Sequence, residues 1–183
     1  MRHLCLRRGA STPISVSAAS GKRIYLSNTP FLPGGGLAAA DAKCVADAPS
    51  GVVNAKALLV ATTRSFSELI DPVTAYVRPD GVAIGNGASI LEAFATSYPG
   101  PALEASISVA GNGSYQGVLD PSTGGVWSGM GPPGVVGENC NDWKSASAGL
   151  LGTIGKSAGW IVTGYGGGNY CNKTFYHLRC VEQ

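Results

Sequence analysis

One segment, residues 138–145 with the sequence ENCNDWKS, constrains the fold of this chain more than any other. It places Cys140 among side-chain amides and carboxylates, and it follows a glycine-rich stretch that begins at Val126. A cysteine in this setting can anchor a long loop that has little regular backbone pairing of its own. The polar neighbours of Cys140 would then either cap loop amides or bind a ligand.

The body of the chain holds three further cysteines, Cys44, Cys171 and Cys180. No CxxC pair occurs and the chain has only 2 histidines, so the spacing expected of a zinc site is absent. Disulfides formed in an oxidising compartment fit better, and they predict a secreted or cell-surface protein. Four cysteines allow three connectivities, and their spacing does not choose among them. A fifth cysteine, Cys5, is interpreted as a spare thiol, the alternative being a lipidated or intermolecular cysteine.

Composition limits the classes of function. A chain of 183 residues suits one domain with a sizeable core, and 27 glycines with 11 prolines predict many loops and turns. No run of 18 apolar residues occurs, so no membrane span is predicted. From residue 22 onward, ten Lys and Arg stand against eleven Asp and Glu, a net charge of 10 − 11 = −1. This neutral body argues against nucleic-acid binding.

The first twenty residues differ from the rest. They contain no acidic residue and no amphipathic period, and residues 9–20 are mostly Ser, Ala and Thr. Such a segment has little apolar surface to bury. We therefore predict a flexible tail over residues 1–20 and one folded domain over residues 21–183.

The remaining chain predicts short strands mixed with two helices. Alternation or apolar runs favour strands at 23–27, 57–61, 125–128, 157–163 and 174–181, and a hairpin that joins 76–78 to 82–84. An alanine-rich helix is predicted at 37–48 with Cys44 facing inward, and capping-box spacing at 65–68 predicts a second helix. Residues 86–124 show no clear period. This mixture predicts the α+β class.

The order of the motifs resembles a C-type-lectin-like domain. A helix with Cys44 comes first, followed by Val-Trp-Ser-Gly at 126–129, Asn-Cys-Asn-Asp-Trp-Lys-Ser at 139–145, Cys171, and a terminal segment around Cys180. More narrowly, residues 22–183 resemble bacterial secreted lectin-like domains of unknown function, which are related in architecture to endostatin. The resemblance implies two short helices, small antiparallel sheets and long irregular loops. It also implies two nested disulfides, Cys44 with Cys180 and Cys140 with Cys171.

Sugar-binding members of the wider superfamily hold calcium, which needs six to eight oxygen ligands. Their site combines a proline-flanked pair of carboxylates or amides with an Asn-Asp pair. Here Pro132 and Pro133 have no carboxylate or amide beside them, so half of such a site is missing. We expect the polar residues near Cys140 to cap loop amides, and we expect no cofactor. A degenerate calcium site is the alternative.

Two further features have a structural and a functional interpretation. His177 lies in a predicted strand without a serine or aspartate partner that the sequence defines, so a structural histidine is expected. Trp127, Trp143 and Trp160 could line a sugar platform, but tryptophans in or beside strands usually fill the core.

The proposed bridge between Cys140 and Cys171 would gather the loops 129–139, 144–156 and 164–170 into one surface. Loops held by a rigid scaffold often carry function. Because the resemblance is to binding domains and no catalytic constellation appears in the sequence, we expect a non-catalytic binding or adhesion module for a glycan or an extracellular protein. A self-assembling structural protein, hence a homo-oligomer, is the alternative, a calcium-dependent lectin is the next, and a hydrolytic enzyme is least supported. The candidate ligand-binding residues are Glu138, Asn139, Asn141, Asp142, Lys144, Tyr165, Asn169 and Tyr170.

Overall fold

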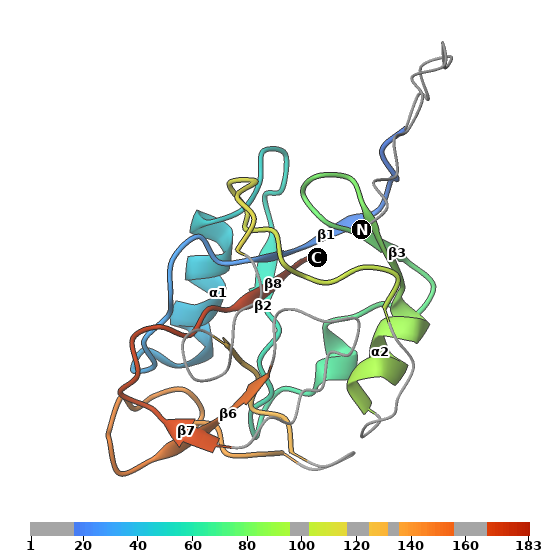
Figure 1. Ribbon diagram of the computed structural model, residues 1–183. Helices are drawn as coiled ribbons and strands as arrows, with labels where there is room; N and C mark the ends of the chain where they lie inside the picture. The colour runs from blue at the N-terminus through green and yellow to red at the C-terminus, as the bar shows by residue number, and fades with distance from the viewer. Residues whose placement is uncertain (1–16, 96–102, 117–124, 132–135, 156–167) are drawn as a thin grey trace, which may run out of the picture.

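A computed structural model of the chain describes residues 17–95, 103–116, 125–131, 136–155 and 168–183 (Figure 1). Within these residues, two α-helices, a short 3-10 helix and eight strands form two sheets. The predicted α+β class is therefore confirmed. None of the helices in the described parts of the chain is long and apolar enough to cross a membrane.

The larger sheet has five strands in the order β2 (Ala55–Ala57), β8 (Arg179–Glu182), β1 (Lys22–Leu26), β3 (Ala75–Val77) and β4 (Ala83–Asn86). β1 runs parallel to β3, whereas the other neighbours are antiparallel. The expectation of purely antiparallel sheets is wrong for this sheet. A parallel pair needs a crossover connection, and the chain between β1 and β3 provides one that includes a helix.

The two faces of this sheet bury different cores. Successive residues of a strand point to opposite faces. Ile24 and Leu26 of β1 thus belong to one buried cluster and Tyr25 to another. The helix α1 (Gly36–Ala46) covers the Tyr25 face, and α2 (Gly87–Ala95) packs with the other cluster; Figure 1 shows the two helices on opposite sides of the sheet.

The helices match the sequence predictions only in part. The helix expected at 37–48 is α1, which begins one residue earlier and ends two residues earlier, and Cys44 is buried as predicted. The prediction of a second α-helix near residues 65–70 is wrong. That segment forms only the 3-10 helix η1 (Phe66–Glu68), and Ser65 makes no capping hydrogen bond with its side chain. The second α-helix is α2, in a region that showed no clear period.

The smaller sheet joins β5 (Val126–Trp127), β6 (Leu151–Gly155) and β7 (Gly168–Tyr170) in that order. β5 lies within the strand expected at 125–128. β6 and β7 fall in the segments 144–156 and 164–170, which were expected to be irregular loops, so that expectation is wrong for these strands. The strand expected at 157–163 lies outside the described residues. β8 begins five residues later than the strand expected at 174–181.

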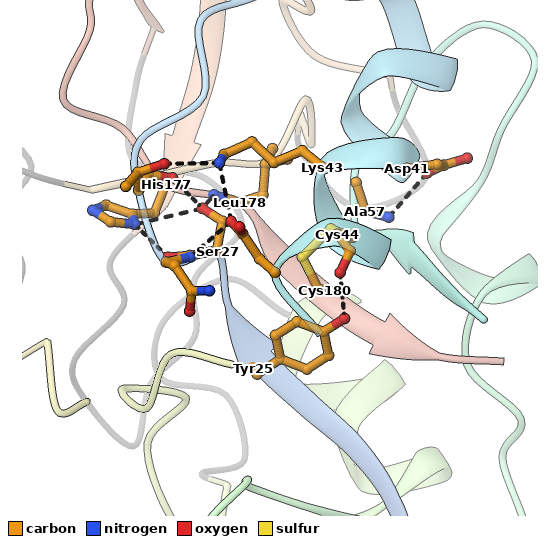
Figure 2. The surroundings of a disulfide bond; sticks show 12 residues. Tyr25, Ser27, Asp41, Lys43, Cys44, Ala57, His177, Leu178 and Cys180 are labelled. Atoms are coloured by element: carbon orange, nitrogen blue, oxygen red, sulfur yellow. Dashed lines mark hydrogen bonds and ion pairs between the residues drawn. A yellow bond between two sulfur atoms is a disulfide. The ribbon is translucent and has the colours of Figure 1, made fainter. Parts of the chain in front are cut away.

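Two disulfides connect these parts, as the resemblance implied. Cys44 of α1 is bonded to Cys180 of β8, with 5.5 Å between their Cα atoms. Cys140 is bonded to Cys171, with 5.7 Å between their Cα atoms. Figure 2 shows the first bridge, beside which the Tyr25 hydroxyl donates to the Cys44 carbonyl at 2.7 Å. The first helix is thus tied to two neighbouring strands of the sheet, β8 through the disulfide and β1 through Tyr25.

Most of the predicted tail, residues 1–16, lies outside the described residues. Residues 17–20 are exposed. The amide of Ala19 donates to the Gly81 carbonyl at 2.9 Å, so this short stretch lies beside the turn between β3 and β4.

Candidate functional site

The segment around Cys140 folds into a left-handed turn. Cys140, Asn141, Asp142 and Trp143 have φ angles of 54°, 55°, 53° and 63°. A non-glycine residue in this region costs roughly 1–2 kcal/mol relative to the right-handed conformation. Four such residues in a row persist only because the surrounding structure fixes them.

Trp143 anchors one end of the turn. Its side chain is buried, and its indole nitrogen donates to the Val60 carbonyl at 3.0 Å. Its own carbonyl accepts from the amides of Gly34 and Gly36 at 2.8 and 2.9 Å. The indole also packs edge to face on Trp127, with 5.7 Å between the ring centres. Trp127 and Trp143 are therefore core residues as expected, and Trp160 lies outside the described residues.

Asp142 ties the turn to a distant loop. Its carboxylate accepts from the Thr62 amide at 2.8 Å, the Thr62 hydroxyl at 2.6 Å and the Asn139 side-chain amide at 3.0 Å. Asn139 in turn accepts from the Asp142 amide at 3.0 Å. The hydrogen bonds from Thr62 lower the pKa of Asp142, with a smaller contribution from the charge of Lys144. Asn139 and Asp142 thus cap loop amides.

This arrangement does not resemble a calcium site. Calcium is surrounded by oxygen ligands, several of them anionic, whereas the Asp142 carboxylate is surrounded by N–H and O–H donors. Over the parts of the chain that the structure describes, no group of three His, Cys, Asp or Glu side chains could hold a metal ion. A cation at Asp142 would first have to displace Thr62 and Asn139.

Asn169 also has a structural role. Its side-chain amide donates to the Tyr176 hydroxyl, and its side-chain oxygen accepts from the Tyr170 amide at 2.9 Å. Tyr176 is buried and packs edge to face on Trp127 with ring centres 4.6 Å apart. Asn169 is therefore half-buried and bonded to the aromatic core.

The other described candidates, Glu138, Asn141, Lys144 and Tyr170, are exposed, and they do not all lie together. The aliphatic stem of Lys144 lies on Gly36 at the start of α1, where an added Cβ would be 3.3 Å from Lys144 Cγ. The Glu138 carboxylate lies instead on Gly168 of β7, where an added Cβ would be 1.9 Å from Glu138 Oε2. Tyr165 lies outside the described residues.

Glu138 and Tyr170 share a surface on the smaller sheet. Tyr170 pairs with Leu151 across β6 and β7, and Leu151 also borders Gly168, on which the Glu138 carboxylate rests. Tyr170 is 53% exposed. We name these four residues, Glu138, Leu151, Gly168 and Tyr170, the Glu138–Tyr170 surface.

The sequence prediction missed Leu151 and Gly168. The apolar pair Leu150-Leu151 is the signal that could have revealed β6, but serine and glycine around it favoured a loop. Gly168 belongs to a glycine-rich stretch that predicts flexibility, and only the register of β7 shows why a residue without a side chain fits beneath Glu138.

His177 is buried and has a structural role, as expected. Its ring nitrogen Nδ1 lies 2.8 Å from the Ser27 carbonyl, to which it can only donate, and 3.5 Å from the Ser27 hydroxyl. That hydroxyl already donates to the Thr29 carbonyl at 2.8 Å and accepts from the Leu178 amide at 3.0 Å. Ser27 and His177 are therefore not arranged as a nucleophile and its base.

No protein-family model matches this sequence, and none of the curated protein sequences compared with it is significantly similar.

Proposed function

We propose that the chain is a non-catalytic binding or adhesion module of C-type-lectin-like fold that works outside the cell. Its ligand would be a glycan or an extracellular protein, bound at the Glu138–Tyr170 surface without calcium. The observation that carries this proposal is an exposed tyrosine, Tyr170, two residues from Gly168, on which the exposed Glu138 rests, in a sheet held by a buried disulfide.

Three features favour this surface as the binding site. A tyrosine offers a large amphipathic contact area at little cost in conformational entropy. The carboxylate of the exposed Glu138 provides hydrogen-bond acceptors. The sheet beneath is held by the bridge between Cys140 and Cys171, whose amides donate to the carbonyls of Leu151 and Leu150 at the start of β6. A rigid support lowers the cost of binding because little has to be ordered.

Other observations support an extracellular, calcium-independent protein. Two buried disulfides fit an oxidising compartment. They have the pairing that the resemblance to C-type-lectin-like domains implies. Asn139 and Asp142, the residues of the Cys140 segment most like calcium ligands, are bonded to donors of the chain itself.

An array of glycans and extracellular matrix proteins, probed with and without calcium, tests this function. We expect binding to at least one class that does not change when calcium is removed by a chelator. Binding that disappears with the chelator would instead favour a calcium-dependent lectin. Absence of binding to every glycan and matrix protein would contradict the proposal.

Once a ligand is found, variants of the chain locate its binding site on the protein. Tyr170→Ala combined with Glu138→Gln should weaken binding at least tenfold, about 1.4 kcal/mol. Matched controls are Tyr115→Ala and Glu104→Gln, because both residues are exposed and neither belongs to this surface. Gly168→Ala adds a third arm, since its methyl group would push the flexible end of Glu138 aside. Full affinity in the double variant would place the site elsewhere.

A further inference from the structure

His177 lies where the two sheets meet. Its amide donates to the Gly125 carbonyl at 3.1 Å, and its carbonyl accepts from the Trp127 amide at 3.0 Å, so its backbone is bonded on both sides of Val126 in β5. Its ring reaches the Ser27 carbonyl, directly after β1, at 2.8 Å. One residue thus connects the smaller sheet to the central strand of the larger sheet.

The next residue strengthens the same connection. The Leu178 amide donates to the Ser27 hydroxyl at 3.0 Å, and the Leu178 carbonyl accepts from the Ser27 amide at 2.9 Å. Figure 2 shows His177, Leu178 and Ser27 close together beside α1. Ser27, Leu178 and His177 are all buried, so water does not readily replace a bond lost here.

The surroundings favour a neutral imidazole. Burial lowers the pKa of His177 most, the bond to Ser27 opposes this, the charge of Lys43 lowers the pKa further, and the charge of Asp47 raises it. Lys43 and Asp47 both lie at the end of α1 and form an ion pair at 3.0 Å. From β5 and from the end of β1, His177 meets backbone groups and the Ser27 hydroxyl.

We propose that His177 is an acid-sensitive clamp between the two sheets, which loosens as the pH falls from about 7 to about 5. In the closed state the imidazole is buried and neutral. When the contact opens, the ring reaches water and takes up a proton at its ordinary pKa of about 6.5. The open state therefore binds more protons below that pH, and acid favours it.

The consequence concerns the smaller sheet, which carries the Glu138–Tyr170 surface. Loosening at His177 would release β5 from the segment that precedes β8, while the disulfide between Cys44 and Cys180 keeps the larger sheet and α1 together. Mild acid would thus free the ligand-binding side of the domain before the domain unfolds. The clamp itself does not depend on the proposed function, because its opening can be measured without a ligand.

Hydrogen exchange of backbone amides, followed by NMR between about pH 7 and pH 5, tests the clamp. After correction for the intrinsic pH dependence of exchange, the opening constants of the Trp127 and His177 amides should rise about threefold or more. The amide of Arg78, which donates to Val82 in the distant hairpin, should show no such rise. Hydrogen bonds to the carboxylates of Asp71, Asp80 and Asp142 lower their pKa values, so these three side chains stay charged over this range.

Two variants give matched arms. His177→Gln can still donate to the Ser27 carbonyl but cannot take up a proton, so its opening constants should not change with pH. His3→Gln removes the other histidine of the chain and should behave like the wild type. Equal pH dependence in the wild type and His177→Gln would overturn the proposal.

Should His177→Gln fail to fold, titration of the His177 ring in the wild type decides the question. An imidazole that titrates below about 6.5 supports the clamp, and one that titrates at or above that value overturns it. Lys43→Met supplies a further readout, since removal of the neighbouring cation should raise the pKa of His177 and reduce the acid-induced opening.

Discussion

A single carboxylate, Asp142, joins two loops that are 80 residues apart in the sequence. It accepts two hydrogen bonds from Thr62 and one from Asn139, and these bonds hold a turn of four left-handed residues. A residue that resembles a metal ligand in the sequence therefore acts here as a loop clamp.

Replacement of Asp142 by Asn should destabilise the domain, because an amide is a weaker acceptor for three donors than a carboxylate. We expect a loss of about 1–2 kcal/mol in the free energy of unfolding, measured with urea near neutral pH. The hydrogen bonds from Thr62 lower the pKa of Asp142 in the folded state. This stabilisation is thus complete above about pH 3.8 and disappears as the pH falls through the folded pKa.

The difference between the wild type and Asp142→Asn should accordingly shrink at low pH. Glu104→Gln serves as the control, because Glu104 is exposed and its side chain takes no part in the hydrogen bonds of Asp142. Equal stability of the wild type and Asp142→Asn near neutral pH would show that the hydrogen bonds of Asp142 do not contribute to the free energy of unfolding.

The sequence identified this polar cluster by its residue types. It did not show which of these residues bond within the protein and which stay exposed. Asn139, Asp142 and Asn169 are bonded to Thr62 and Tyr176 or to each other, and these partners become visible only in the folded chain. The exposure of Glu138 and Tyr170 could not be predicted for the same reason, because nothing in the local sequence distinguishes these two residues from the others.

At the scale of elements, the sequence predicted those with a local signal. The alanine-rich α1 and the hairpin at Pro79-Asp80-Gly81 were recognised, and β3 and β4 flank that turn. α2 was missed although Ile90 and Phe94 are one turn apart and both buried, because glycine precedes them and the helix has only nine residues. β6 was missed because its pairing partners, β5 and β7, are distant in sequence.

The two disulfides should contribute unequally to stability. A bridge restricts the unfolded chain more when it closes a longer loop, and the sequence separations are 136 for Cys44–Cys180 and 31 for Cys140–Cys171. Loop entropy gives upper values of about 5 and about 3.7 kcal/mol. We therefore expect Cys44→Ser with Cys180→Ser to lower the free energy of unfolding more than Cys140→Ser with Cys171→Ser. Urea unfolding of both double variants checks the order, and the reverse order would contradict the loop-entropy account.

At the scale of the whole molecule, both edges of the larger sheet carry a blocked backbone group. At β2 the outward amide of Ala57 donates to the Asp41 carboxylate at 2.9 Å, and Asp41 is itself held by Arg64. At β4 the Ile84 carbonyl accepts from the Glu104 amide at 3.0 Å. Unpaired backbone groups at a sheet edge can pair with a strand of another chain, and these hydrogen bonds occupy some of those groups.

The edges of the smaller sheet are also occupied. β5 is bonded to His177, and in β7 the amide of Tyr170 donates to Asn169 while its carbonyl accepts from Lys173 at 3.1 Å. Strand addition between copies would have to break these bonds first.

We therefore predict that the protein is a monomer in solution. Size-exclusion chromatography with light scattering should give the mass of one 183-residue chain over a wide range of concentration. A mass that rises with concentration would favour the self-assembling alternative, and Asp41→Ala would then show whether the β2 edge takes part.

The pairing of the first strand with the last has a mechanical consequence. β1 and β8 are antiparallel neighbours (Figure 1), and in their register Ile24 lies opposite Val181 and Tyr25 opposite Cys180. A force that pulls residues 22 and 183 apart would open this pair from its end, one residue pair at a time. The opening would stop at Cys180, where the load passes through a covalent bond into Cys44 and the helix α1. The covalent path between the two ends therefore runs through residues 22–44, the disulfide and residues 180–183, so tension cannot extend residues 45–179, which include the smaller sheet and the proposed binding surface.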